Sequence, residues 1–148
     1  MATVTVDEVK RFMRDQASYN ILLDEVEFTE DDINAALGFA VDEFNAFTPM
    51  TAYDGDSFPN RWILLMGTVK HLLTSEVFLQ LRNEVHVSDG TLPIGIDDKA
   101  SAYLAFRNTI RSEWDSKVGD MKQQINMEGG YGGVSSGYRY IRSGTRYP

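Results

Sequence analysis

The segment from residue 59 to residue 85 constrains the fold of this chain more than any other feature. It begins at Pro59, which suits the first position of a helix because its φ is already helical and its missing N–H is not needed there. The apolar residues that follow cover more than one side of a helix: Trp62, Ile63, Leu64, Leu65, Met66, Val69, Leu72, Leu73, Val77, Phe78 and Leu81. A helix that is apolar nearly all round is buried. We therefore predict a helix from Pro59 to about Val85 as the central, most buried element.

The size and composition of the chain indicate one globular unit. It has 148 residues, of which 43% are hydrophobic and 24% are charged, close to the average for globular domains. The absence of cysteine excludes disulfides, thiolate metal sites and thiol nucleophiles. The longest unbroken apolar run, Trp62 to Met66, is far shorter than the roughly 20 residues that cross a bilayer. We expect a soluble chain with no membrane partner, made in the cytoplasm because it starts without a secretory signal.

Two helices are expected before the central one. Thr5 and Glu8 have the spacing of a capping box, which predicts a short helix after Thr5. A second helix is predicted from Thr29, which is followed by three acidic residues that suit a helix start, and it should end before Pro49. Its apolar stripe consists of Ile33, Leu37, Ala40, Val41, Phe44 and Phe47. Residues 16–27 are expected to form a connection that packs on the core.

A turn and a second long helix follow the central one. Asp89-Gly90 is a turn signal, and the alternating pattern of residues 86–95 allows a short extended piece or a hairpin. The last helix is predicted from Asp97 or Asp98 to about Met127, so the two long helices each measure roughly 40–45 Å. We therefore predict an all-α fold: a helical bundle with two long antiparallel helices, a short extended or hairpin loop and an extended C-terminal arm.

The last twenty residues differ in composition from the rest. All 22 Asp and Glu lie in residues 1–128, whereas residues 129–148 hold three arginines, four tyrosines, six glycines and no acid. Two glycines at Gly129-Gly130 are expected to stop the helix. We predict two parts: a helical domain at 1–128 and a flexible Gly/Tyr/Arg arm at 129–148. The arm gains order only from another molecule, because its composition cannot form a core.

The sequence contains few residues of the types that commonly act in catalysis. The only histidines are His71 and His86, and neither lies beside a nucleophile elbow or a phosphate-binding loop. His71 falls within the most apolar helix, which favours a packed, hydrogen-bonded histidine. Asp54-Gly-Asp56 starts like a calcium loop but lacks the later ligands, so we interpret it as a solvated turn. We predict no enzyme, no catalytic residue, no cofactor and no metal site.

Two partners are open for the arm. Tyr and Arg interleaved with Gly can stack on bases and contact phosphates of single-stranded nucleic acid. Tyr and Arg are also enriched in the energetic centres of protein interfaces, and an acidic body repels phosphate, which favours a protein partner. The alternative function is thus a small cytoplasmic adaptor module that binds single-stranded nucleic acid through the arm.

The order of elements resembles the head–tail connector, or adaptor, proteins of tailed bacteriophages. The resemblance is carried by the helix from Thr29 to Phe47, the helix from Pro59 to Val85, the turn Ser88-Asp-Gly90, the helix from Ala100 to Met127 and the arm from Gly129 to Arg142. The resemblance lies in the overall order of the elements and not in a diagnostic motif. It implies a structural virion protein of the neck, between capsid and tail.

The resemblance also implies partners and contact residues. The family forms a homo-oligomeric ring, usually of twelve copies, that docks under the portal, extends the DNA channel and offers a surface to an adjacent neck or tail-completion protein. Double-stranded DNA then passes through without specific binding, as an acidic lining would allow. The arm residues implied as portal contacts are Tyr131, Tyr138, Arg139, Tyr140, Ile141, Arg142, Arg146 and Tyr147.

Overall fold

The computed structural model describes residues 4–20, 25–83, 86–89, 92–95 and 99–130. Within residues 83–100 only the backbone is described. The described chain is mainly helical, as predicted, and forms four helices. These are α1 (Val6–Met13), α2 (Glu30–Ala46), α3 (Arg61–Asn83) and α4 (Lys99–Gly130). Between α3 and α4, strands β1 (His86–Asp89) and β2 (Leu92–Gly95) pair antiparallel, with His86 opposite Gly95.

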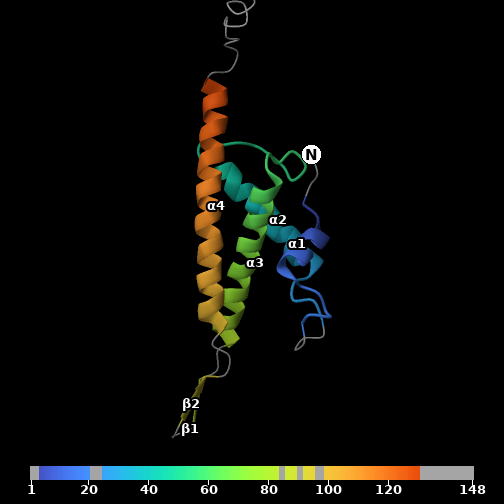
Figure 1. The fold of residues 1–148 in the computed structure, drawn as a ribbon, viewed down its shortest axis with the longest axis vertical. Coiled ribbons are helices and arrows are strands. Elements are labelled where there is room, and N and C mark those ends of the chain that lie inside the picture. The colour runs from blue at the N-terminus through green and yellow to red at the C-terminus, as the bar shows by residue number, and fades with distance from the viewer. Residues whose placement is uncertain (1–3, 21–24, 84–85, 90–91, 96–98, 131–148) are drawn as a thin grey trace, which may run out of the picture.

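The helices are arranged around α3. Figure 1 shows α4 lying beside α3, with the chain direction reversed between them, while α2 crosses obliquely behind α3 and α1 lies on the side of α3 away from α4. Element contacts agree, because α3 touches α2, α4 and α1. The prediction that the segment after Pro59 forms the central helix is therefore confirmed.

Local capping explains where α1 and α2 begin. In α1 the Thr5 side chain accepts from the Glu8 backbone N–H, and the Glu8 carboxylate accepts from the Thr5 N–H at 3.0 Å. Thr29 and Asp32 form the same reciprocal box at the start of α2. Each box satisfies two backbone donors that a helix start leaves without an intrahelical partner. Both predicted starts are confirmed.

The predicted start of α3 is two residues early. The helix begins at Arg61, and its cap is Asn60, whose Oδ1 accepts from the N–H groups of Trp62 (2.9 Å) and Ile63 (3.1 Å). Asn is among the best N-cap residues, so it outcompetes the general preference for proline at the first helical position. The described helix ends at Asn83, and the predicted last residues, 84 and 85, lie outside the described residues.

The predicted end of the last helix is also early. α4 continues through Gly129 and Gly130, so the two glycines do not stop it at the expected position. A Cβ added at either glycine would meet nothing within 4 Å, which shows that both lie in the open, where no packing decides their conformation. The capping expected from Asp97 and Asp98 falls outside the described residues.

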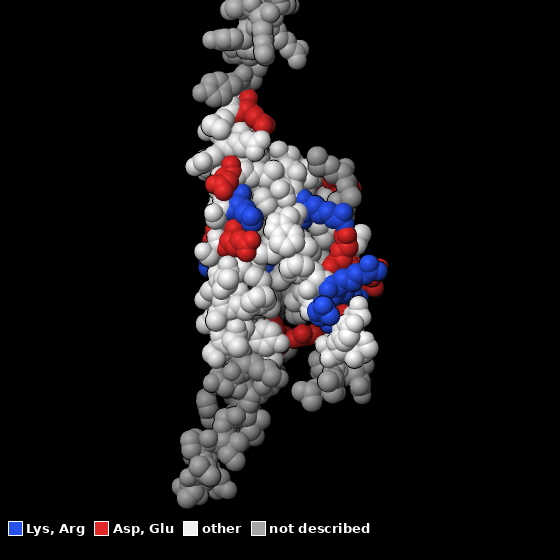
Figure 2. Space-filling view, in the orientation of Figure 1, with Lys and Arg blue, Asp and Glu red and all other residues white. Residues whose placement is uncertain are grey.

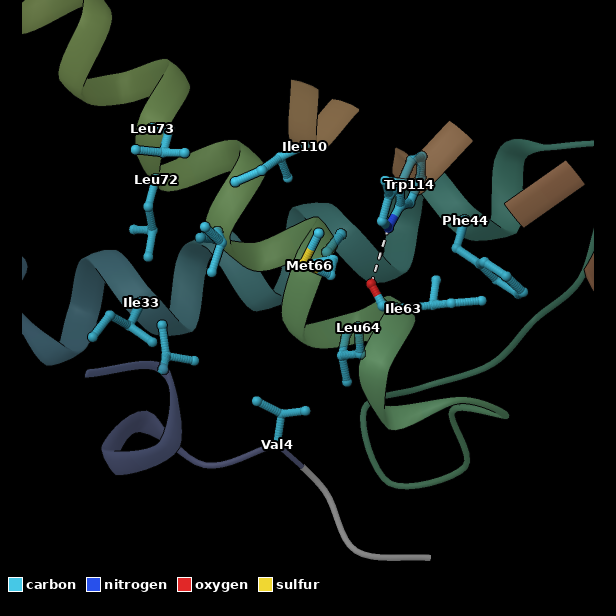
Figure 3. Close-up of a cluster of buried hydrophobic side chains, with 14 of the residues drawn as sticks. Val4, Ile33, Phe44, Ile63, Leu64, Met66, Leu72, Leu73, Ile110 and Trp114 are labelled. Atoms are coloured by element: carbon cyan, nitrogen blue, oxygen red, sulfur yellow. Dashed lines mark hydrogen bonds between the residues drawn. The ribbon is translucent and has the colours of Figure 1, made fainter. Parts of the chain in front are cut away.

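The core lies where α2 crosses α3 and α4. Trp114 of α4 is 1% exposed, and its Nε1 donates to the carbonyl of Ile63 at 2.9 Å (Figure 3). A Cβ at Gly67 would lie 2.8 Å from Trp114 Nε1 and 2.9 Å from the Cβ of Ala40, so only glycine allows three helices to approach this closely here. The buried apolar residues around this point are Val4, Val9, Phe28, Ile33, Ala36, Ala40, Phe44, Phe58, Ile63, Leu64, Met66, Val69, Leu72, Leu73, Ile110, Trp114 and Val118.

The narrow apolar stripe in the second half of α4 packs inside the subunit. Trp114 and Val118 are 1% and 0% exposed, and Met121 and Ile125 pack against the same core. The burial shows that this stripe is used within the fold.

The end of the α3–α4 pair nearest to β1 and β2, residues 75–83 and 101–108, is different, and we call it the distal end. In Figure 1 no other described helix lies beside it. Val77 is buried there at 8%, but five large apolar side chains are exposed: Phe78 by 64%, Leu79 by 40%, Leu81 by 53%, Leu104 by 45% and Phe106 by 57%. Figure 2 shows the visible surface over this end as largely free of charged side chains. The apolar residues of α3 are thus only partly explained by the core.

Among the described residues, one helix segment, Arg61–Arg82, is long and apolar enough to cross a membrane by length and composition alone. The core helix of a globular protein passes the same test, and 61% of the most apolar window is buried inside the fold. The segment also carries Lys70, which pairs with an acid of α2. The fold therefore accounts for much of this apolarity as core packing.

Candidate functional site

The most concentrated group of ionisable side chains joins α2 to α3. Glu43 of α2 accepts hydrogen bonds through Oε2 from Lys70 Nζ and contacts Nε2 of His71 at 2.9 Å. Lys70 is 4% exposed, and its Nζ lies 3.6 Å from the centre of a Trp114 ring, which adds a cation–π contact from α4. We call Glu43, Lys70, His71 and Trp114 the polar cluster.

The electrostatics of the polar cluster favour a charged Glu43. Burial raises the pKa of Glu43, but the hydrogen bonds from His71 and Lys70 and their charges outweigh it and lower the pKa from 4.5 to about 2. Burial lowers the pKa of Lys70, and the bond to Glu43 partly offsets this. A carboxylate with so low a pKa is a weak general base near neutral pH. The cluster is therefore best suited to tying α2 to α3 and α4.

His71 is the one residue of this cluster that the sequence singled out. It was expected to be a packed, hydrogen-bonded histidine, and it is bonded to Glu43 with its side chain 28% exposed. Its ring also packs at a tilt on Phe39, with ring centres 5.8 Å apart. Sequence reasoning missed Glu43 and Lys70. A usable signal was present, because Lys70 is a charged residue in the most apolar helix and therefore requires a partner.

A second buried lysine holds the loop between α2 and α3 against α4. Lys122 is 2% exposed, and its Nζ donates to the carbonyl of Pro49 (2.9 Å) and to the hydroxyl of Thr51 (2.7 Å). The Thr51 hydroxyl donates in turn to Asn45 of α2, whose side chain also bonds the backbone of Tyr53 at both N–H and C=O. Burial lowers the pKa of Lys122. This network fixes the loop between α2 and α3 to α2 and α4.

A third polar link organises the connection between α1 and α2. The Asp15 carboxylate is buried and accepts from the backbone N–H groups of Glu27 (2.6 Å) and Phe28 (2.9 Å) and from the side chain of Asn20 (2.7 Å). Phe28 itself lies in the core. The expectation that residues 16–27 pack on the core is wrong for the described part of this connection, residues 16–20 and 25–27, because Tyr19 and Val26 are 56% and 40% exposed and only the flanking Asp15 and Phe28 are buried. Residues 21–24 lie outside the described residues.

The other residues that the sequence singled out are those of the arm and of the Asp54 turn. The whole set of arm residues, Tyr131, Tyr138, Arg139, Tyr140, Ile141, Arg142, Arg146 and Tyr147, lies outside the described residues. Asp54 forms a local turn, because its carboxylate accepts from the N–H (2.7 Å) and hydroxyl (2.6 Å) of Ser57, and these bonds lower its pKa. Within the described ranges, no group of three or more His, Asp or Glu side chains could hold a metal ion.

The hollows on the surface are open. One of them, about 710 Å³, is lined by residues of α4 alone, so no second element of the described chain closes it. Polar side chains such as Ser112, Ser116 and Asp120 line it. It lacks the convergence of groups from several elements that ligand sites usually have.

Comparisons with known proteins add no identification. No protein-family model, curated protein or solved structure matches the chain.

Proposed function

We propose that this chain is a structural virion protein, a head–tail connector of a tailed bacteriophage. In this proposal it forms a homo-oligomeric ring, of twelve copies if it follows the family that it resembles, and sits in the neck between capsid and tail. The ring lies under the portal vertex, extends the channel for double-stranded DNA and docks the next neck or tail protein. The molecule is then not an enzyme and needs no cofactor.

One observation carries the proposal: the α3–α4 pair continues beyond the core with its apolar side chains uncovered. α4 has 32 residues and is about 48 Å long. The helices that form the core cover only one part of it, and at the distal end Phe78 and Phe106 stay more than half exposed. Large exposed apolar side chains in a group mark interaction surfaces. A subunit of a larger assembly has a use for them, whereas an isolated domain does not.

The polar groups of the fold support the same class of function. Glu43 and Lys70 are engaged with each other, and Lys122 is occupied by the loop that it holds. These groups stabilise the body and leave the surface to make contacts. The function of a connector depends on shape and assembly, so it agrees with a body whose buried charges serve packing.

In the proposal the arm, residues 129–148, binds the portal by strand addition or in a groove. It contains Arg139, Arg142 and Arg146 and no acid, which suits an acidic portal surface. Ordering its backbone costs on the order of 15–30 kcal/mol, so binding has to supply the order. The acidic body, with a net charge of −8 for the whole chain, would let DNA slide past without being held.

Co-sedimentation with portal protein tests the proposal. The full chain should bind portal rings, and a chain that ends at residue 128 should lose most of this binding while keeping its helical circular dichroism. A matched control replaces Tyr and Arg in the arm with Ser and keeps its length. Full binding by the truncated chain would contradict the role of the arm, and no binding by the full chain would contradict the connector function.

The alternative, an adaptor for single-stranded nucleic acid, is separated by a gel shift. If the arm binds single-stranded DNA, the shift should disappear in the chain that ends at residue 128 and weaken steeply with salt. The connector proposal expects no shift at physiological salt.

A further inference from the structure

We draw no further inference here: the strongest candidate, the patch of exposed apolar side chains at the distal end of the α3–α4 pair, already carries the proposed function, and nothing in the structure shows what covers it.

Discussion

The two ends of the α3–α4 pair use similar residues in different ways. Trp114 and Phe106 lie eight residues apart on α4, yet Trp114 is 1% exposed and Phe106 is 57% exposed. At Trp114 a third helix, α2, crosses the pair, and Gly67 and Ala40 bring it close. At Phe106 no other described helix is present (Figure 1). An apolar residue on these helices thus belongs to the core only where a third element covers it.

The largest expected effect separates the two ends directly. Trp114→Ala should lower the free energy of unfolding by about 3–5 kcal/mol, because it leaves a cavity and an unpaired Ile63 carbonyl. Phe106→Ala should change it by no more than about 0.5 kcal/mol in the monomer. Urea unfolding at low protein concentration measures both. Similar losses would mean that the distal end is packed as tightly as the core.

The next largest effect concerns the polar cluster in the covered half. Glu43→Gln should cost about 1–2 kcal/mol, since it leaves the Lys70 ammonium buried without its carboxylate, while solvent screening of the partly exposed Glu43 limits the loss. The neighbouring Asp42 is exposed on the same helix, so Asp42→Asn is the matched control and should cost less than about 0.5 kcal/mol. Chemical unfolding of the two variants side by side gives the difference. Equal stabilities would show that the cluster does not hold α2 in place.

A methyl group added at Gly67 tests whether three helices approach closely at this position. Gly67→Ala should destabilise the chain by about 1–2 kcal/mol, because the new Cβ overlaps Trp114 and Ala40 and outweighs the better helix propensity. Gly119→Ala, at a helical position where a Cβ meets nothing within 4 Å, should stabilise it by about 0.5–1 kcal/mol. Thermal unfolding compares the two. A stabilising Gly67→Ala would contradict the crossing of the helices at this point.

The smallest effect is the dependence of the polar cluster on pH. The pKa of Glu43 is lowered from 4.5 to about 2, so its contribution is present above pH 4.5 and is lost as the pH falls towards 2. Its side chain is 34% exposed and screened by solvent, so we expect the loss to be about 1 kcal/mol. Unfolding of the parent and of Glu43→Gln across this range should show the difference narrowing towards pH 2. A constant difference would contradict the charge pairing.

Local signals in the sequence predicted much of this fold. The capping boxes at Thr5 and Thr29 depend only on residues three positions apart, which the sequence shows directly. Both predicted helix starts were therefore correct. Local preference also produced an error, because it favoured Pro59 over Asn60 at the start of α3. The best cap was one residue further along the chain.

The candidate site could be predicted only in part, because its contacts join distant residues. Glu43 meets His71 across 28 positions of sequence, and Lys122 meets Thr51 across 71. Such pairs depend on how α2 crosses α3 and how α4 returns along it, which periodicity does not determine. The exposure of Phe106 could not be predicted for the same reason, because an apolar stripe in the sequence does not show which part of it another helix covers.

Amide hydrogen exchange tests most directly whether the distal end is uncovered in the subunit and covered on assembly. At low concentration, amides in 75–83 and 101–108 should exchange much faster than those in 63–72 and 110–118. At a concentration where the chain assembles, the distal amides should slow while the core amides stay unchanged. Equal protection of both ends in the monomer, or no change at the distal end on assembly, would contradict this account.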